Sequence, residues 1–185
     1  KGAGECLVSQ PDLPLKFYII PRDGSSSPTV IEGPSKAFEI HTPFAHDGVP
    51  IDDSFAVPSS EANDEFMTLY SAGWDDFKEG TFLGEWGASQ EWNFPIASSL
   101  TPDFNNIDST VLWRYVVNIT KKTVERTAAP GCENLCIDHP HVNPLYEGKR
   151  ECRFLYASLS NFRGVSGPPL GYVKIDLKTG ERKVW

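Results

Sequence analysis

Short apolar runs alternate with turns of Gly, Pro, Asp and Ser along most of this chain. The runs are rich in aromatic and β-branched residues and have the length of strands rather than helices. We expect strands at Lys16–Pro21, Thr29–Glu32, Ala37–His41, Val111–Thr120, Thr123–Thr127, Arg153–Leu159, Gly171–Leu177 and Glu181–Trp185. The pattern of apolar and polar positions therefore predicts an all-β fold.

Three further stretches carry a weaker pattern. Ser60–Tyr70 has room for one or two helical turns, although Phe66–Ser71 fits a strand equally well. His46–Asn63 and Gly84–Asn106 mix Gly, Ser, Pro and acidic residues without any period, so we expect long loops there. Loops of this length often carry function in compact domains.

One strand–turn–strand pattern occurs twice in the chain. Val117–Thr123 aligns with Ile175–Glu181, and each segment places a Lys- and Thr-containing turn between two strands. A third hairpin of this kind is expected within Phe17–Glu32. Hairpins that recur every 40–60 residues or so are typical of β-propeller blades, so the chain has the length of about three blades.

Composition and charge narrow the classes of function. Hydrophobic residues make up 39% and charged residues 23% of the 185 positions, which is ordinary for one globular domain with a core. The formal charge of −8 disfavours a nucleic-acid surface, which requires basic residues. No apolar run approaches the roughly 18 residues of a membrane span. Neither end resembles a natural terminus, so we expect residues 1–185 to be a single fragment of a larger domain, truncated at both ends.

The four cysteines are too widely spaced to indicate a disulfide framework in a chain of this length. We therefore favour free thiols over one structural disulfide. One short segment nevertheless gathers four zinc-capable side chains: Cys132, Cys136, His139 and His141. Zinc fingers and ribbons keep a longer span between their ligand pairs. A small structural zinc site is therefore an alternative interpretation of this segment.

The strand that ends at His41 continues as TPFAHD. This segment resembles the carotenoid cleavage oxygenase pattern, in which an apolar strand ends in His-x-x-Asn-Ala-aromatic-Glu and the His is an iron ligand. His41 and Ala45 match that pattern. Phe44, His46 and Asp47 replace the Asn, the aromatic residue and the Glu.

A second segment, CIDHPHVNP, resembles the same family's Glu-Phe-Pro-Arg/Gln-Ile-Asn-Pro block. Asp138 stands at the position of the Glu and His139 at that of the Phe. The block's remaining matches are Pro140, Asn143 and Pro144. Two further segments are similar to family strands in the expected order: Phe17–Arg22, which ends in Pro-Arg, and the hairpin Gly171–Trp185.

Resemblance to the carotenoid cleavage oxygenases implies part of a seven-bladed β-propeller, with about three blades present. It also implies a non-haem Fe(II) held by four histidines at the propeller axis, with carboxylates behind them. His41 is the one matched ligand, and the other three are expected outside this chain. Asp138 is the expected carboxylate that accepts the N–H of the His41 ring nitrogen facing away from the metal, directly or through one water. The two side chains should therefore lie within about 6 Å, the reach of a one-water bridge.

The implied reaction adds both atoms of O2 across a conjugated carbon–carbon double bond of a carotenoid, apocarotenoid or stilbene-like substrate. Phe38 and Phe44 are the candidates for lining the apolar substrate tunnel. The implied partners are an apolar polyene and O2, with no nucleic acid. Any peripheral membrane contact is expected to involve regions outside residues 1–185. Both plastid and cytoplasm are compatible with this reading.

Two readings of function remain open. One is an active dioxygenase, of which residues 1–185 alone are expected to be inactive because they carry one of four ligands. The other is a non-catalytic propeller that kept the fold and lost the iron, since Phe44 and Asp138 depart from the family pattern.

Overall fold

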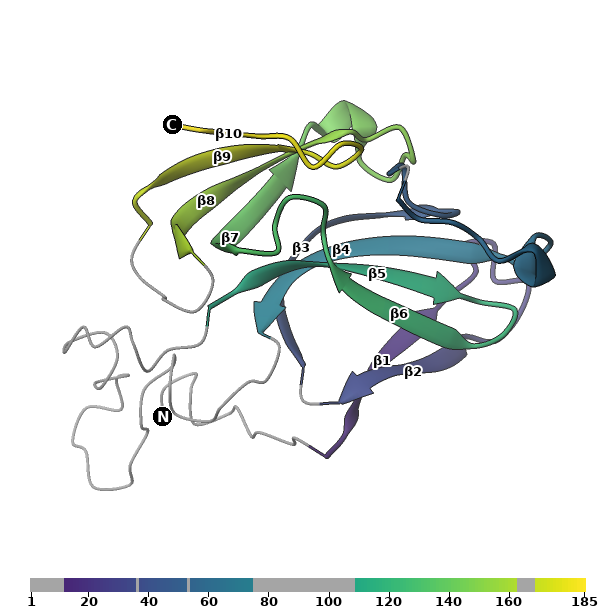
Figure 1. Ribbon diagram of the computed structural model, residues 1–185. Coiled ribbons are helices and arrows are strands. Elements are labelled where there is room, and N and C mark those ends of the chain that lie inside the picture. Colours follow the sequence, from purple (N-terminus) through teal and green to yellow (C-terminus); the bar gives the residue numbers. More distant parts are fainter. Residues whose placement is uncertain (1–11, 36, 53, 75–108, 163–168) are drawn as a thin grey trace, which may run out of the picture.

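The computed structural model describes residues 12–35, 37–52, 54–74, 109–162 and 169–185 (Figure 1). Ten strands run through these residues: β1 (Pro14–Ile19), β2 (Thr29–Ser35), β3 (Phe38–Asp47), β4 (Phe66–Trp74), β5 (Val111–Asn118), β6 (Thr123–Ala128), β7 (Leu135–Val142), β8 (Phe154–Phe162), β9 (Gly171–Asp176) and β10 (Arg182–Val184). Two short 3-10 turns, η2 (Ser59–Glu61) and η4 (Pro144–Tyr146), join them. The all-β prediction is confirmed.

All eight expected strands overlap strands of the structure. Between Ser60 and Tyr70 the strand alternative is confirmed as β4, and only η2 is helical. Strand β7 was not predicted, and it carries Asp138. The loop expected at Gly84–Asn106 lies outside the described residues.

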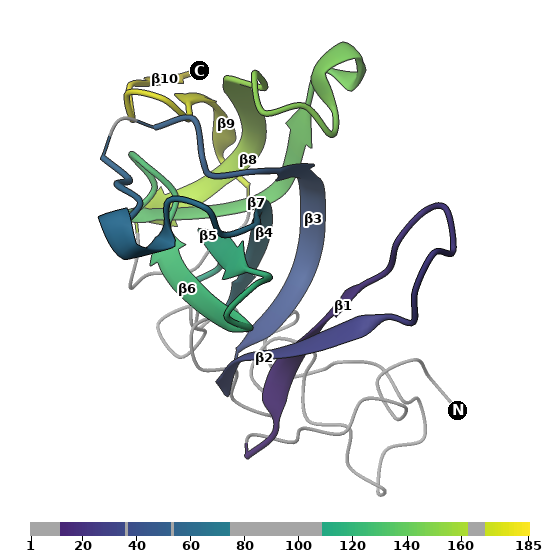
Figure 2. The same cartoon turned by 90° about the vertical axis from the view of Figure 1, so that its right-hand side faces the viewer.

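The strands form three antiparallel sheets that stack as layers, as Figures 1 and 2 show. Strands β1 and β2 pair alone, the next four follow the order β3-β4-β5-β6, and the last four follow β7-β8-β9-β10. Each four-stranded sheet is thus built in chain order, as a propeller blade is. The partial propeller that the sequence predicted, with about three blades, is confirmed.

The repeated hairpins occupy equivalent places in the two four-stranded sheets. The first copy forms β5 and β6, the third and fourth strands of its sheet, and the second copy forms β9 and β10, the third and fourth of the next. The hairpin expected within Phe17–Glu32 forms β1 and β2. The repeat in the sequence therefore corresponds to a repeat of blades.

Two apolar clusters hold the three layers together. The larger lies between the four-stranded sheets and includes Phe44, Tyr70 and Leu112 from one sheet and Leu155 and Ile175 from the other. The smaller packs Leu15 and Phe17 of β1 against Val111, Trp113 and Tyr115 of β5. Both faces of the β3–β6 sheet are consequently covered.

This stacking brings the first strands of the two larger sheets, β3 and β7, into contact. Each is an edge strand of its sheet. Side chains from segments far apart in the sequence can therefore meet at this edge. In the part of the chain that the structure describes, no helix is long and apolar enough to cross a membrane.

Candidate metal centre

His41 lies in the middle of β3, where the pairing with β4 is irregular. The register shifts between Glu39 and His41 and again between His41 and Phe44. Such bulges re-aim side chains at sheet edges. The His41 side chain remains 39% exposed, so the ring is open to a ligand while its strand is held in the sheet.

Asp138 reaches His41 from β7, the neighbouring edge strand. The Asp138 Oδ1 lies 2.7 Å from the His41 Nδ1, although the two residues are 97 positions apart in the sequence. The Ser158 hydroxyl donates to the backbone carbonyl of Asp138 at 2.8 Å and holds this part of β7 against β8. The predicted proximity of His41 and Asp138 is confirmed, and no bridging water is needed.

This hydrogen bond fixes the orientation of the imidazole. A carboxylate accepts hydrogen bonds, so the His41 Nδ1 carries the proton and donates it to Asp138. In the neutral ring the lone pair then resides on Nε2, which is the atom left for a metal ion. The shorter Asp side chain reaches the ring directly because β3 and β7 are in contact.

A buried carboxylate fixes β3 just before His41. Glu39 accepts a hydrogen bond from the Tyr115 hydroxyl and faces the Arg126 guanidinium at 3.5 Å. Burial raises the pKa of Glu39, and the hydrogen bond from Tyr115 acts in the opposite direction. These contacts link β3 to β5 and β6 of the same sheet. The strand that carries His41 is therefore held in place by side chains from the third and fourth strands.

Sequence reasoning gave His139 no role at this site, yet its ring lies there. The ring centroids of His41 and His139 are 4.4 Å apart. The group of metal-capable side chains found among the described residues is His41, Asp138 and His139, with one ligand atom of each within 4.8 Å of the others. The signal in the sequence was Pro140, because a proline inside a strand marks an edge or a bulge.

The two aromatic candidates for substrate contact lie in different surroundings. Phe44 is 4% exposed and stacks on Tyr70 within the cluster between the sheets. Phe38 is half-buried at the start of β3, with its ring 5.7 Å from that of Trp74. Their contact with substrate remains a prediction, and Phe44 has a clear packing role besides.

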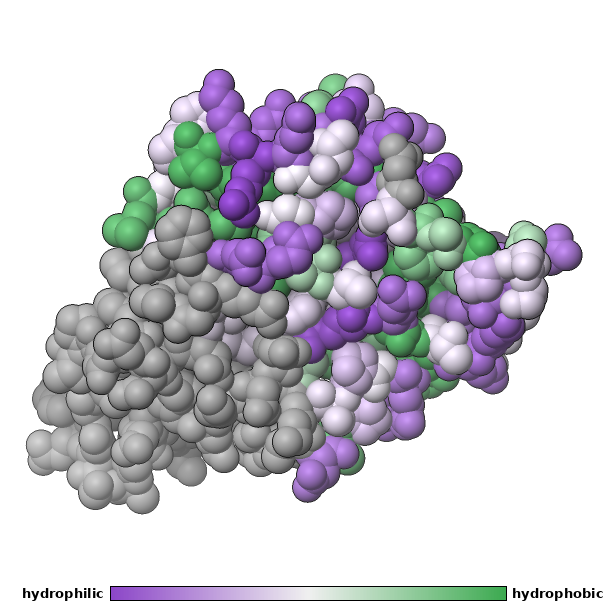
Figure 3. Space-filling model, viewed as in Figure 1, coloured by the Kyte–Doolittle hydropathy of each residue, from purple (hydrophilic) through white to green (hydrophobic). Residues whose placement is uncertain are grey.

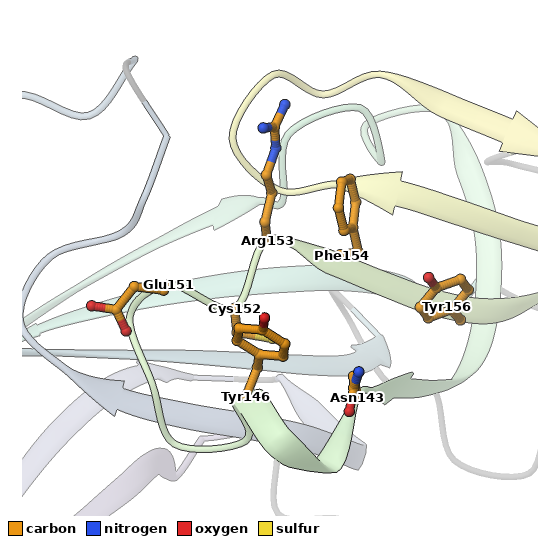
Figure 4. A pocket seen from close by; sticks show the side chains of 7 residues that line it. All are labelled: Asn143, Tyr146, Glu151, Cys152, Arg153, Phe154 and Tyr156. Carbon is orange, nitrogen blue, oxygen red and sulfur yellow. The ribbon is translucent and has the colours of Figure 1, made fainter.

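Two pockets lie elsewhere on the described surface. One, of about 200 Å³, opens between η4 and the start of β8, where Tyr146, Phe154 and Tyr156 face it (Figure 4). The other, of about 450 Å³, includes the charged residues Asp52, Arg114 and Lys178 in its lining. Neither includes His41, Asp138, Phe38 or Phe44 among its lining residues.

The zinc alternative finds no support among the described residues. Cys132 and Cys136 are buried free thiols, and neither belongs to the cluster of metal-capable side chains. Burial raises the pKa of the Cys132 thiol, which disfavours the thiolate that zinc requires. The expectation of free thiols is confirmed for Cys132, Cys136 and Cys152.

Comparison with known proteins gives one consistent result. The family model described as "Retinal pigment epithelial membrane protein" matches residues 1–185. An apocarotenoid-15,15'-oxygenase from Synechocystis sp. is 23% identical over 183 residues, which are 97% of this chain and 30% of that protein. The chain therefore spans about a third of the length of this relative.

Solved structures agree on the fold. A tryptophan-to-alanine mutant of the Synechocystis apocarotenoid oxygenase matches with a TM-score of 0.71 at 23% identity, covering 100% of this chain and 32% of that one. A cobalt-substituted form of the Synechocystis enzyme matches with a TM-score of 0.68 at 22% identity and the same coverage. That relative therefore accepts a cobalt ion.

Proposed function

Because this chain belongs to the retinal pigment epithelial membrane protein family, which includes the carotenoid oxygenases, we propose that the full-length protein is a non-haem Fe(II) dioxygenase. It cleaves a conjugated carbon–carbon double bond of a carotenoid, apocarotenoid or stilbene-like substrate with O2. His41 is one of its iron ligands. The hydrogen bond between the His41 Nδ1 and Asp138 is the observation that carries this proposal.

The residues present fit an iron site. A metal-binding histidine usually donates its other ring N–H to a carboxylate or carbonyl, which fixes the tautomer and makes the metal-facing nitrogen more basic. His41 has this arrangement, and its half-exposed ring leaves the Nε2 accessible. Imidazole nitrogen is a common ligand of iron. Bound Fe(II) would supply the site of oxygen activation, and Asp138 would hold the ring in place.

The substrate contacts of this chain would be apolar. A polyene has no groups for hydrogen bonding, so its alignment depends on aromatic and aliphatic walls that exclude water. Phe38 is half-buried three positions before His41 on the same strand, and we propose it as one of these walls. Phe44 would act mainly by packing β3 against the β7–β10 sheet, which holds His41 and Asp138 together.

The test uses a full-length protein that contains these residues, incubated with an apocarotenal and isotope-labelled O2. Two carbonyl products should form, with label in both, and no reaction should occur without O2. His41→Ala should abolish cleavage, whereas His141→Ala, an exposed histidine on the same segment as Asp138, should not. Cleavage by His41→Ala at the wild-type rate would contradict the proposal.

The non-catalytic alternative makes the opposite prediction, since it expects a folded full-length protein without iron or cleavage. That alternative rests on Phe44 and Asp138, which replace the Asn and the Glu of the family pattern. The direct 2.7 Å contact between Asp138 and His41 favours the catalytic one, because the shorter side chain still reaches the ring.

A further inference from the structure

The edge strands β3 and β7, which meet at the metal centre, carry the same irregularity at corresponding places. On β3, the three steps from His41 to Phe44 lie opposite two steps on β4. On β7, the three steps from Asp138 to His141 likewise lie opposite two steps on β8. Each strand therefore holds one extra residue directly after the side chain that contributes to the site. His41 and Asp138 occupy equivalent positions in successive blades.

A proline stands at the same place in both irregular segments. The extra residue belongs to Thr42–Pro43 on β3 and to His139–Pro140 on β7, and we call these two segments the proline bulges. Proline has no backbone N–H to donate to a neighbouring strand, and within sheets it is confined to edges and bulges. The regular pairing of each strand is thus interrupted where the direction of a functional side chain has to be fixed.

Serine hydroxyls from the second strand of each blade contact the backbone at both proline bulges. The Ser158 hydroxyl of β8 donates to the Asp138 carbonyl at 2.8 Å. The Ser71 hydroxyl of β4 donates to the His41 carbonyl at 3.4 Å and lies 3.0 Å from the Thr42 hydroxyl. Both serines are buried, so water competes little for these contacts. The same type of side chain therefore replaces part of the interrupted pairing in each blade.

The contact between Asp138 and His41 is sensitive to the position of both backbones. The Asp138 Oδ1 and the His41 Nδ1 are 2.7 Å apart. The Asp138 carboxylate is joined to its backbone by a single methylene, so it has little reach to compensate for a displaced strand. A displacement of about 1 Å would lengthen the contact beyond about 3.5 Å, where a hydrogen bond is lost. Groups that fix the two bulges consequently fix the orientation of the imidazole.

We propose that Ser71 and Ser158 are positioning residues of the metal centre. Each stabilises one proline bulge in the conformation that directs His41 and Asp138 towards each other. Ser158 acts through the backbone of Asp138, and Ser71 acts through the backbone of His41. This inference rests on the proposed function for its effect on iron, whereas its effect on the His41 ring is measurable without any metal.

The first measurement uses the metal-free full-length protein with nitrogen-15 in its histidine rings. The signals of His41 are assigned by their loss in His41→Ala. In the wild type the neutral ring should carry its proton on Nδ1, because the carboxylate of Asp138 accepts it. Ser158→Ala and Ser71→Ala should each raise the share of His41 rings protonated on Nε2, because the bulge no longer keeps the carboxylate and the ring in contact.

The second measurement is the iron affinity of the full-length protein by competition with a chelator. Ser158→Ala and Ser71→Ala should each weaken iron binding by about three- to tenfold, the usual effect of losing one hydrogen bond. Thr68→Val is the matched control, because the buried Thr68 hydroxyl of β4 also donates to a carbonyl, that of Gly48 at 2.8 Å. It should lower the stability of the fold but leave the His41 ring and the iron affinity unchanged.

A double-mutant cycle separates positioning from general destabilisation. Since Ser158 acts through Asp138, adding Ser158→Ala to Asp138→Asn should weaken iron binding no further. A serine variant with a wild-type His41 ring, an equal loss of affinity in Thr68→Val, or additive effects in the double variant would overturn the positioning role. A full-length protein that takes up no iron would contradict the proposed function instead, and the protonation of the His41 ring would then decide the roles of the two serines.

Discussion

At the scale of single residues, the contact between His41 and Asp138 shows how a short carboxylate can act where the family pattern has a longer one. The two atoms are 2.7 Å apart, so Asp138 makes a direct hydrogen bond to the ring. Asp138 also accepts the backbone N–H of His139, which restricts its own rotation. These two hydrogen bonds hold the Asp138 carboxylate against the His41 ring, although the Asp side chain is one methylene shorter than Glu.

This geometry predicts the effect of removing the charge from Asp138. In the full-length protein, Asp138→Asn should lower iron affinity or cleavage by about 10- to 100-fold, because the carboxylate no longer orients the ring and raises its basicity. Asp138→Glu, which restores the family residue, is the matched control and should retain most of the activity. Iron affinity can be measured by competition with a chelator. Unchanged affinity in Asp138→Asn would show that this carboxylate has no part in iron binding.

Phe44 is a second residue to which the structure gives a specific role, the packing of the core. Its ring is 4% exposed and lies in the cluster between the two larger sheets. Phe44→Ala should lower the free energy of unfolding by about 3–5 kcal/mol, the usual result of emptying a buried aromatic site. Phe154→Ala is the matched control, since Phe154 is exposed, and should change it far less. Denaturant unfolding of both variants measures the difference, and equal small effects would contradict the packing role.

At the scale of secondary-structure elements, the strands were predictable where a short apolar run lies between turn residues. Strand β5, eight buried residues rich in Val, Trp and Tyr, left a clear pattern. Strand β7 did not, because Asp138, His139 and Pro140 interrupt it and its bulge breaks the alternation. The contact between His41 and Asp138 followed from a family resemblance. A local sequence pattern cannot predict a contact between strands so distant in the sequence. His139 was missed because the bulge arises from the pairing of β7 with β8, which the sequence of β7 alone does not reveal.

The close approach of two turns is a feature of the same scale. Gly131, after β6, has a φ of 76°, and a Cβ there would lie 2.2 Å from the backbone oxygen of Gly180 in the β9–β10 turn. The Arg182 guanidinium also donates to the Gly131 carbonyl at 3.1 Å. Any side chain at Gly131 would therefore push the two larger sheets apart at this point.

Gly131→Ala should consequently destabilise the fold beyond the penalty for a positive φ. Gly24 is a matched control, because it has a φ of 67° with nothing within 4 Å of an added Cβ. We expect about 1 kcal/mol of destabilisation for Gly24→Ala and at least about 2 kcal/mol more for Gly131→Ala. Thermal or denaturant unfolding tests this. Equal destabilisation by the two substitutions would show that the turns do not need their close contact.

An ion pair between Arg153 and Asp176 links the start of β8 to the end of β9. We expect this ion pair to make the stability of the fold depend on pH. Hydrogen bonds from Arg153 at 2.6–2.9 Å lower the pKa of Asp176 to about 2. Because this pKa is depressed on folding, the pair stabilises the protein above the ordinary pKa of about 4, and that stability is lost as the pH falls towards 2.

Arg153→Met should therefore unfold at a lower temperature than the wild type above about pH 4, and the two melting temperatures should converge as the pH falls to about 2. Arg22→Met, in the exposed turn after β1, is the control and should behave as the wild type at every pH. Melting curves across this range measure the effect. A difference that stays constant with pH would rule out the ion pair as its source.

At the scale of the whole molecule, the two ends of the stack differ from its middle. Among the described residues, the β3–β6 sheet is covered on both faces, whereas the β7–β10 sheet is covered on one. Its other face exposes Tyr156, Tyr172 and Trp185, and hydrophobic side chains reach the surface beside β9 and β10 in Figure 3. In a closed propeller each blade packs between two others. The chain spans 30% of its apocarotenoid oxygenase relative, so further blades are expected to cover this face.

The same geometry limits what the described residues can do alone. His41 and Asp138 lie on edge strands, and the His41 side chain remains 39% exposed in the described structure. The iron site proposed above needs ligands beyond His41. The 185-residue chain by itself is therefore expected to show no cleavage of a polyene, whatever divalent ion it binds.

The most direct test of His41 as an iron ligand is the iron content of the purified full-length protein and of its His41→Ala variant. The wild type should contain close to one iron per chain and no stoichiometric zinc. His41→Ala should keep its β-sheet circular dichroism and lose most of the iron, because the remaining imidazoles no longer complete the site. Full iron occupancy in a folded His41→Ala protein, or a folded wild type that takes up no iron, would contradict this assignment.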